Sequence, residues 1–208
     1  MMKVDSILSK RTHPDIAPMK CILYITGRGG SLQKGLAIYL AGIADEFDGV
    51  AVSSQFLRQE PLHQVQIIQE KIKKEPTRPI IANSYGAYLT LLALIDIDVT
   101  PDVVLLLSPV LGAANAKDRM YYSRPPLTNQ LEDALSNNTL IRPKVTKLIM
   151  GDQDELYSPE RISTIDSYFG METAQIVAGE GHMLSRRAVQ EFINYNLRQA
   201  SLKVSCRF

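Results

Sequence analysis

The chain has 208 residues, of which 45% are hydrophobic and 22% charged, and its formal net charge is +1. This length and composition are typical of one globular domain with a full hydrophobic core. A nearly neutral chain gives no electrostatic argument for binding nucleic acid or an anionic membrane, and no apolar run approaches the roughly 18 residues that span a bilayer. Residues 1–15 lack a secretory h-region, so we expect a cytoplasmic protein.

The pattern alternates between strand and helix from residue 20 to residue 200. Residues 1–19 contain two prolines and no sustained period, and predict an N-terminal arm. We expect strands at 21–25, 49–52, 79–82, 103–107, 147–150 and 174–177, and helices at 32–43, 62–75, 86–94, 127–135, 159–169 and 185–197. The sequence therefore predicts a single α/β domain over residues 1–208, with a mostly parallel six-stranded sheet and helices on both faces.

Helix and cysteine signals add detail to this expectation. Ser31 is a candidate N-cap for the first helix, Ser158 and Pro159 mark the start of the helix at 159–169, and Gly170 marks its end. The two cysteines, Cys21 and Cys206, have no metal-type spacing, so we expect both to be structural and predict no metal site.

Ser84 stands at the bend between a short apolar strand and a helix of good helix formers. A strand that turns abruptly into a helix strains the residue at the bend and projects its side chain outward, and it requires small residues two positions away on each side. Ala82 and Gly86 are both small, so the segment 82–86 is a variant of the Gly-x-Ser-x-Gly nucleophile elbow. The structural alternative is that Ser84 only caps the helix.

Three further loops follow predicted strands, at 26–31, 151–154 and 179–182, and all should open at the same edge of the sheet. A serine nucleophile needs a base, a carboxylate that orients the base, and donors for the developing oxyanion. His182 lies in such a loop, whereas His13 in the arm and His63 in a helix are expected to face solvent. Asp152 and Asp154 compete for the role of carboxylate, and spacing alone does not separate them.

These loops together resemble those of the α/β-hydrolase superfamily. The segment 26–31 is similar to its His-Gly-x-x-Gly-Ser oxyanion loop, 82–86 to its nucleophile elbow, 151–154 to its acid loop and 181–183 to its histidine loop. The resemblance implies the following roles: Ser84 as nucleophile, His182 as base, Asp154 as orienting acid, and the backbone N–H groups of Arg28 and Tyr85 as oxyanion hole.

This chain departs from the family pattern in three places. Thr26 stands where the family has His, and Ala82 where it has Gly. The first two strands of the family are missing or reduced to the arm, which would make this a compact, minimal member.

The implied activity is a serine hydrolase that cleaves an ester of a small soluble substrate. A thioesterase or acyltransferase with the same triad is an alternative that the sequence does not separate from it. A non-catalytic binding protein on the same fold would be expected to have lost a triad residue. A phosphate-cradling role for Gly27, Gly29 and Gly30 is disfavoured because no Lys-Ser/Thr follows, so we expect no cofactor.

The segment 112–126 lies where the family places its cap. It is short, basic and aromatic, which predicts substrate-binding side chains at Arg119, Tyr121 and Tyr122, with Arg28 adding a positive charge in the oxyanion loop. These residues suggest a small acyl substrate with an anionic group. The alternative is a solvated loop whose arginines contact water.

Overall fold

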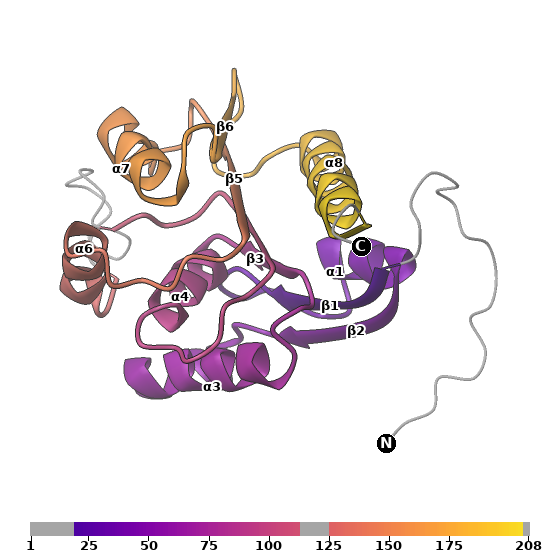
Figure 1. The fold of residues 1–208 in the computed structure, drawn as a ribbon, viewed down its shortest axis with the longest axis horizontal. Coiled ribbons are helices and arrows are strands. Elements are labelled where there is room, and N and C mark those ends of the chain that lie inside the picture. The colour runs from indigo at the N-terminus through magenta and orange to yellow at the C-terminus, as the bar shows by residue number, and fades with distance from the viewer. Residues whose placement is uncertain (1–18, 113–124, 206–208) are drawn as a thin grey trace.

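The computed structural model describes residues 19–112 and 125–205 (Figure 1). The strands are β1 (Met19–Ile25), β2 (Ala44–Val50), β3 (Ile80–Asn83), β4 (Val103–Leu107), β5 (Val145–Gly151) and β6 (Ala174–Val177). The helices are α1 (Leu36–Ile43), α2 (Ser54–Leu57), α3 (Pro61–Lys74), α4 (Tyr85–Ala93), α6 (Thr128–Ser136), α7 (Pro159–Phe169) and α8 (Arg186–Ser205).

In the described residues the strands form one six-stranded sheet in the order β2-β1-β3-β4-β5-β6, and every neighbouring pair is parallel. All five residues of β4 are buried, because an all-parallel sheet is covered on both faces. Side chains alternate along this strand: Leu106 packs in one hydrophobic cluster, while Leu105 and Leu107 pack in the other. The predicted parallel sheet is confirmed.

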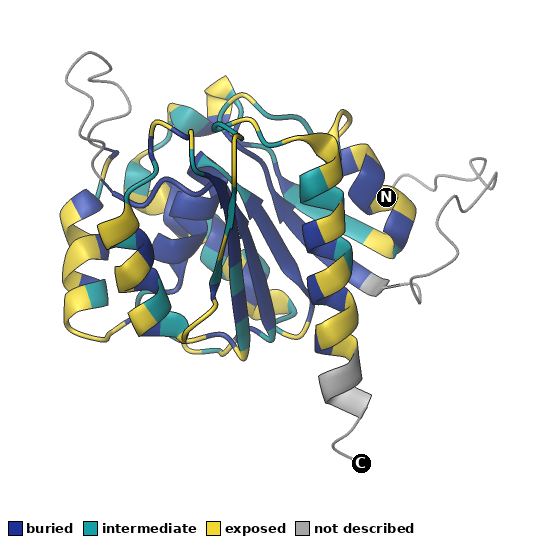
Figure 2. Ribbon diagram, turned by 90° about the horizontal axis from the view of Figure 1, so that it is seen from above, coloured by how far each residue is buried: buried dark blue, intermediate teal, exposed yellow. Residues whose placement is uncertain are grey.

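The helices divide between the two faces of the sheet. Helices α3, α4, α6 and α7 cover one face and α1 and α8 the other, with the buried strands between them (Figures 1 and 2). Ile68 and Leu89 are fully buried on the first side, and Leu40 and Ile193 on the second. The sheet's carboxyl edge, where the strand-end loops gather, is left for a functional site.

Several predicted boundaries are wrong. Helix α1 begins at Leu36 and not near residue 32, and Ser31 does not cap it: the Ser31 hydroxyl accepts the N–H of Gln33 at 3.1 Å within the preceding turn. Strand β2 begins at Ala44 and not near residue 49. The prediction missed its first residues because β2 is an edge strand whose exposed positions are polar, so the apolar pattern marked only its buried end.

The start of α7 is as predicted, with the Ser158 hydroxyl accepting the N–H of Arg161 at 3.4 Å. The final helix runs on to Ser205, beyond the expected residue 197. Met19 begins β1 instead of ending an arm; residues 1–18 and most of the predicted cap, 113–124, lie outside the described residues.

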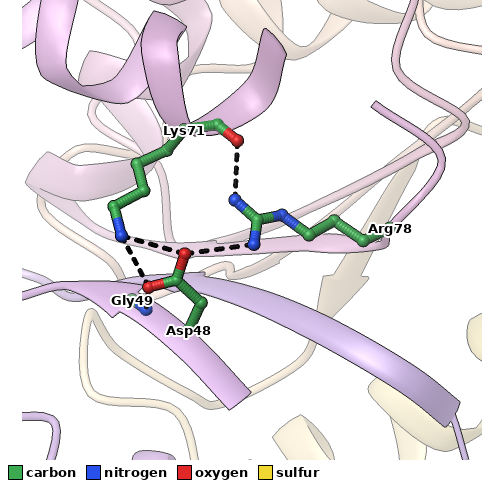
Figure 3. Close-up of polar contacts among 4 residues, drawn as sticks. All are labelled: Asp48, Gly49, Lys71 and Arg78. Carbon is green, nitrogen blue, oxygen red and sulfur yellow. Dashed lines mark hydrogen bonds and ion pairs between the residues drawn. The ribbon is translucent and has the colours of Figure 1, made fainter. Parts of the chain in front are cut away.

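A charged network links β2 to α3 and to Arg78, two residues before β3 (Figure 3). Lys71 Nζ donates to the two carboxylate oxygens of Asp48 at 2.7 and 2.9 Å, and Arg78 donates to Oδ2 at 3.1 Å. Arg78 also donates to the Lys71 carbonyl at 2.6 Å, and the N–H of Gly49 donates to Asp48. Burial opposes ionisation of Asp48, but these donors outweigh it and lower its pKa below the ordinary value.

Candidate active site

Ser84 lies at the sharp bend between β3 and α4, where the sequence predicted a nucleophile. Its φ is 50° and its ψ is −117°, a strained conformation for a residue with a side chain. A Cβ on Gly86 would overlap the carbonyl oxygen of Thr26 at the end of β1, so α4 can start this close to the sheet only with glycine there. Ala82 is fully buried. The small residues of the motif thus occupy the positions where the backbones crowd.

The side chain of His182 contacts Ser84. Ser84 Oγ and His182 Nε2 lie 2.8 Å apart, although the two residues are 98 positions apart in the sequence. On the other side of the ring, His182 Nδ1 lies 2.9 Å from Asp154 Oδ2. Because an ionised carboxylate only accepts hydrogen bonds, this contact places the ring proton on Nδ1 and leaves Nε2 to accept the hydroxyl proton of Ser84.

The carboxylate that contacts the imidazole is Asp154 and not Asp152. The Asp154 side chain is fully buried, and its second oxygen, Oδ1, accepts the N–H of Leu156 at 2.8 Å. Asp152 Oδ1 instead accepts the N–H of Gly179 at 2.7 Å. The hydrogen bond that Asp154 accepts from His182 raises the pKa of His182 above its ordinary value; burial opposes this rise, and the charges of Asp154 and Glu155 add to it.

The loop after β1 reaches the nucleophile. A Cβ on Gly27 would lie 3.3 Å from Ser84 Cβ, which brings the backbone at Arg28 beside the elbow. Tyr85 is the first residue of α4, and the first N–H of a helix has no intrahelical acceptor. The residues implied as oxyanion donors, Arg28 and Tyr85, therefore both lie next to the elbow that carries Ser84.

Thr26 fixes this loop to its neighbour. Its buried hydroxyl accepts the N–H of Val52 at 2.9 Å, and the carbonyl of Val52 accepts the N–H of Gly29 at 2.8 Å. At the position where the α/β-hydrolase motif has histidine, the side chain of Thr26 thus connects the loop after β1 to the loop after β2.

A cavity of about 260 Å³ opens above Ser84 and His182. Its walls include Arg28, Tyr85 and Asn83, together with apolar side chains; the apolar residues are Val110, Pro125, Leu156 and Met183. The Arg28 guanidinium carbon lies 4.8 Å from the centroid of the Tyr85 ring, a stacking distance. Arg28 is thus at the site, as expected, while Arg119, Tyr121 and Tyr122 lie outside the described residues.

Glu155 also lines the cavity, although no sequence motif marked it as a site residue. The sequence signal that could have indicated this position is that Glu155 directly follows Asp154. The apolar wall residues Val110 and Leu156 follow β4 and β5 respectively, and only the strand-end position could have indicated them. His63 is exposed on α3, as predicted, and His13 lies outside the described residues.

Neither metal nor membrane features were found in residues 19–112 and 125–205. This part of the chain holds no group of three or more His, Cys, Asp or Glu side chains arranged for a metal ion. Nor does it contain a helix with the length and apolar character needed to cross a membrane. A cytoplasmic location stays a prediction.

No protein-family model and no curated protein matches the sequence. Solved structures do match. Est1E from Butyrivibrio proteoclasticus superposes with a TM-score of 0.63 at 12% identity, covering 89% of each chain. The enzyme MGS-MChE2, described as an alpha/beta hydrolase from the metagenome of lagoon sediments at Mar Chica, Morocco, gives 0.59 at 14% identity, covering 90% of this chain and 92% of that one.

The chain has the α/β-hydrolase fold. A monoacylglycerol lipase from Paleococcus ferrophilus shares it, with a TM-score of 0.61 at 13% identity over 88% of this chain and 95% of that one. In the described residues, the first strand along the chain, β1, lies in the interior of the sheet, between β2 and β3. The strand-end loops that carry Ser84, Asp154 and His182 lie at the edge where this fold holds its functional residues.

Proposed function

We propose that this protein is a serine hydrolase that cleaves an ester bond of a small soluble substrate. The observation that carries the proposal is the continuous series of hydrogen bonds from Ser84 Oγ through His182 to Asp154. The strained backbone at Ser84 and the adjoining cavity support it, as does the fold shared with a protein named as a monoacylglycerol lipase.

In this mechanism His182 Nε2 takes the hydroxyl proton while Ser84 Oγ attacks the acyl carbonyl carbon. The N–H groups of Arg28 and Tyr85 stabilise the oxyanion of the tetrahedral intermediate. His182 then gives its proton to the leaving alcohol, and the acyl-enzyme forms on Ser84. A water that is deprotonated by His182 releases the acid and regenerates the serine.

Labelling with a fluorophosphonate probe tests the nucleophile. We expect covalent labelling of the wild-type protein and loss of labelling by at least ~10³-fold in Ser84→Ala, because the probe reacts with an activated serine hydroxyl. Ser136→Ala is the matched control, since Ser136 is an exposed serine on α6. No labelling of the wild-type protein would favour the non-catalytic binding protein.

The class of acyl bond requires a separate comparison. A thioesterase or acyltransferase would use the same three side chains, so the triad does not discriminate. Matched oxygen esters and thioesters with the same acyl group, assayed on wild type and on Ser84→Ala, separate an esterase from a thioesterase, and transfer of the acyl group to an added alcohol instead of water would reveal an acyltransferase. We expect a higher kcat/KM for the oxygen ester.

We also propose that Arg28 favours substrates with an anionic group. Arg28 lines the cavity, which supports the proposal, whereas the acidic residue Glu155, which lines the same cavity, opposes it. Neutral and carboxylated esters of equal size should respond differently to Arg28→Ala, with a loss of roughly tenfold in kcat/KM for the carboxylated ester alone. Equal losses on both esters would rule out this preference.

A further inference from the structure

The segment that carries His182 is attached to the turn after β5 by backbone contacts. Asp152 Oδ1 accepts the N–H of Gly179 at 2.7 Å, and the N–H of Gln153 donates to the carbonyl of Glu180 at 2.9 Å. A Cβ on Gly151 would overlap that same carbonyl oxygen, so the two backbones touch. The turn that carries Asp154 therefore also holds the chain two residues before His182.

The carboxylate of Glu180 closes the other side of the histidine segment. Its Oε2 accepts the N–H of Ser185 at 2.5 Å, and its Oε1 accepts the Ser185 hydroxyl at 2.6 Å. Ser185 in turn accepts the N–H of Ala188 at 3.2 Å, in the first turn of α8. His182 thus lies inside a short loop, 180–185, that is closed by the side chain of Glu180.

These contacts matter because the side chain of His182 is partly exposed to solvent. Its side chain is 23% exposed, and it follows Gly181, which has no side chain to pack. The Nδ1 contact with Asp154 and the Nε2 contact with Ser84 each require the ring within a few tenths of an ångström of its position. A segment with glycines at 179 and 181 holds such a position only if its backbone is fixed elsewhere.

We propose that Glu180 and Asp152 are positioning residues that hold His182 against Asp154 and Ser84. Neither carboxylate contacts the imidazole; each acts by fixing the backbone on which the ring is carried. This inference rests on the proposed hydrolase function. It gives Asp152 a role other than that of triad acid, the role for which it competed in the sequence.

Among the described residues, the charges of Asp154 and Glu155, in the loop after β5, act on His182, and Arg28, in the loop after β1, lines the same cavity. Loss of the Glu180 contacts should lengthen the Nδ1–Asp154 distance. Because the Asp154 hydrogen bond is the largest cause of the raised pKa of His182, that pKa should fall toward ~6.5 when the ring is released. A substitution that merely lowers stability would not move it.

Four variants and one control test the proposal. Glu180→Ala and Asp152→Ala should lower kcat by about tenfold with little change in KM, the size expected when a catalytic group loses its support. Glu180→Gln and Asp152→Asn keep an acceptor oxygen and should retain most of the activity. Glu191→Ala removes an exposed carboxylate from α8 that pairs with Arg187, and should behave as wild type.

The pKa of His182, measured by NMR titration with His182→Ala for assignment, is the second readout and needs no catalysis. A lower pKa in Glu180→Ala, restored in Glu180→Gln, supports the positioning role. An unchanged pKa and kcat in both alanine variants would overturn it, and so would equal losses in Glu180→Gln and Glu180→Ala. If fluorophosphonate fails to label the wild type, the hydrolase proposal fails, while the titration still reports whether Glu180 holds the ring.

Discussion

Two carboxylates in this molecule, Asp48 and Asp154, accept hydrogen bonds from basic side chains, and their partners differ in one property. Asp48 binds Lys71 and Arg78, two residue types whose side chains do not titrate near neutral pH in general (Figure 3). Asp154 binds His182, whose charge changes near neutrality. An aspartate carboxylate therefore forms a permanent ion pair in one place and part of a proton-accepting pair with histidine in the other.

The surroundings of the two carboxylates also differ. The Asp48 side chain is 28% exposed and accepts two hydrogen bonds from Lys71, one from Arg78 and one from a backbone N–H, so its charge is well compensated. The Asp154 side chain is fully buried and has a backbone donor for one oxygen and the imidazole for the other. Loss of Asp48 should thus affect folding, and loss of Asp154 should affect chemistry.

The largest expected effect is on catalysis. Asp154→Ala should lower kcat by about 10⁴-fold, because the imidazole loses both its tautomer and its orientation. Asp152→Ala should cost only about tenfold by the positioning argument. Steady-state kinetics on the best ester found for the wild type gives both values. An Asp152 variant as impaired as the Asp154 variant would move the acid to Asp152.

The next effect is on stability. Asp48→Asn should lower the free energy of unfolding by about 2 kcal/mol, because it removes the counter-charge of Arg78, whose side chain is 4% exposed. Urea denaturation measures this loss, and labelling of Ser84 by fluorophosphonate should stay at the wild-type rate. Asp45→Asn, at an exposed position of the same strand, is the matched control. A loss no larger than that of the control would show that the network does not stabilise the fold.

The third effect is the pH dependence that separates the two networks. His182 must be neutral to take a proton, and its pKa is raised, so kcat/KM should rise with pH through a value above ~6.5. The pKa of Asp48 is lowered in the folded protein. The stability that Asp48 contributes is therefore fully present at a pH above its ordinary pKa, and it is lost only as the pH falls through the pKa of the folded state. Between pH 5 and 8, roughly, activity should therefore change while the contribution of Asp48 does not.

A pH–rate profile measured beside unfolding curves for wild type and Asp48→Asn checks both statements. His63→Ala, which alters an exposed histidine on α3, should leave the rate profile unchanged. A rate that is flat over this range with a chemical step limiting would contradict the role of His182 as base.

The sequence by itself determined the alternation of strands and helices and the place of Ser84. Both signals are local: the apolar run of β4 is continuous in the chain and is buried as a strand, and the small residues around Ser84 permit the sharp bend. It also indicated His182, since the carboxyl ends of parallel strands meet at one edge. The polar edge strand β2 showed the limit of such patterns, because its exposed side chains carry no apolar period.

Only the tertiary structure decided which aspartate contacts the imidazole. Asp152 and Asp154 are two residues apart, and their directions depend on the turn after β5 and on the segment 28 residues further on that packs against it. The same long-range packing gave Thr26 its bond to Val52, placed Glu155 in the cavity and brought Glu180 to Ser185. Hydrogen bonds between loops leave no periodic trace in a sequence, because each depends on where two separate backbones meet.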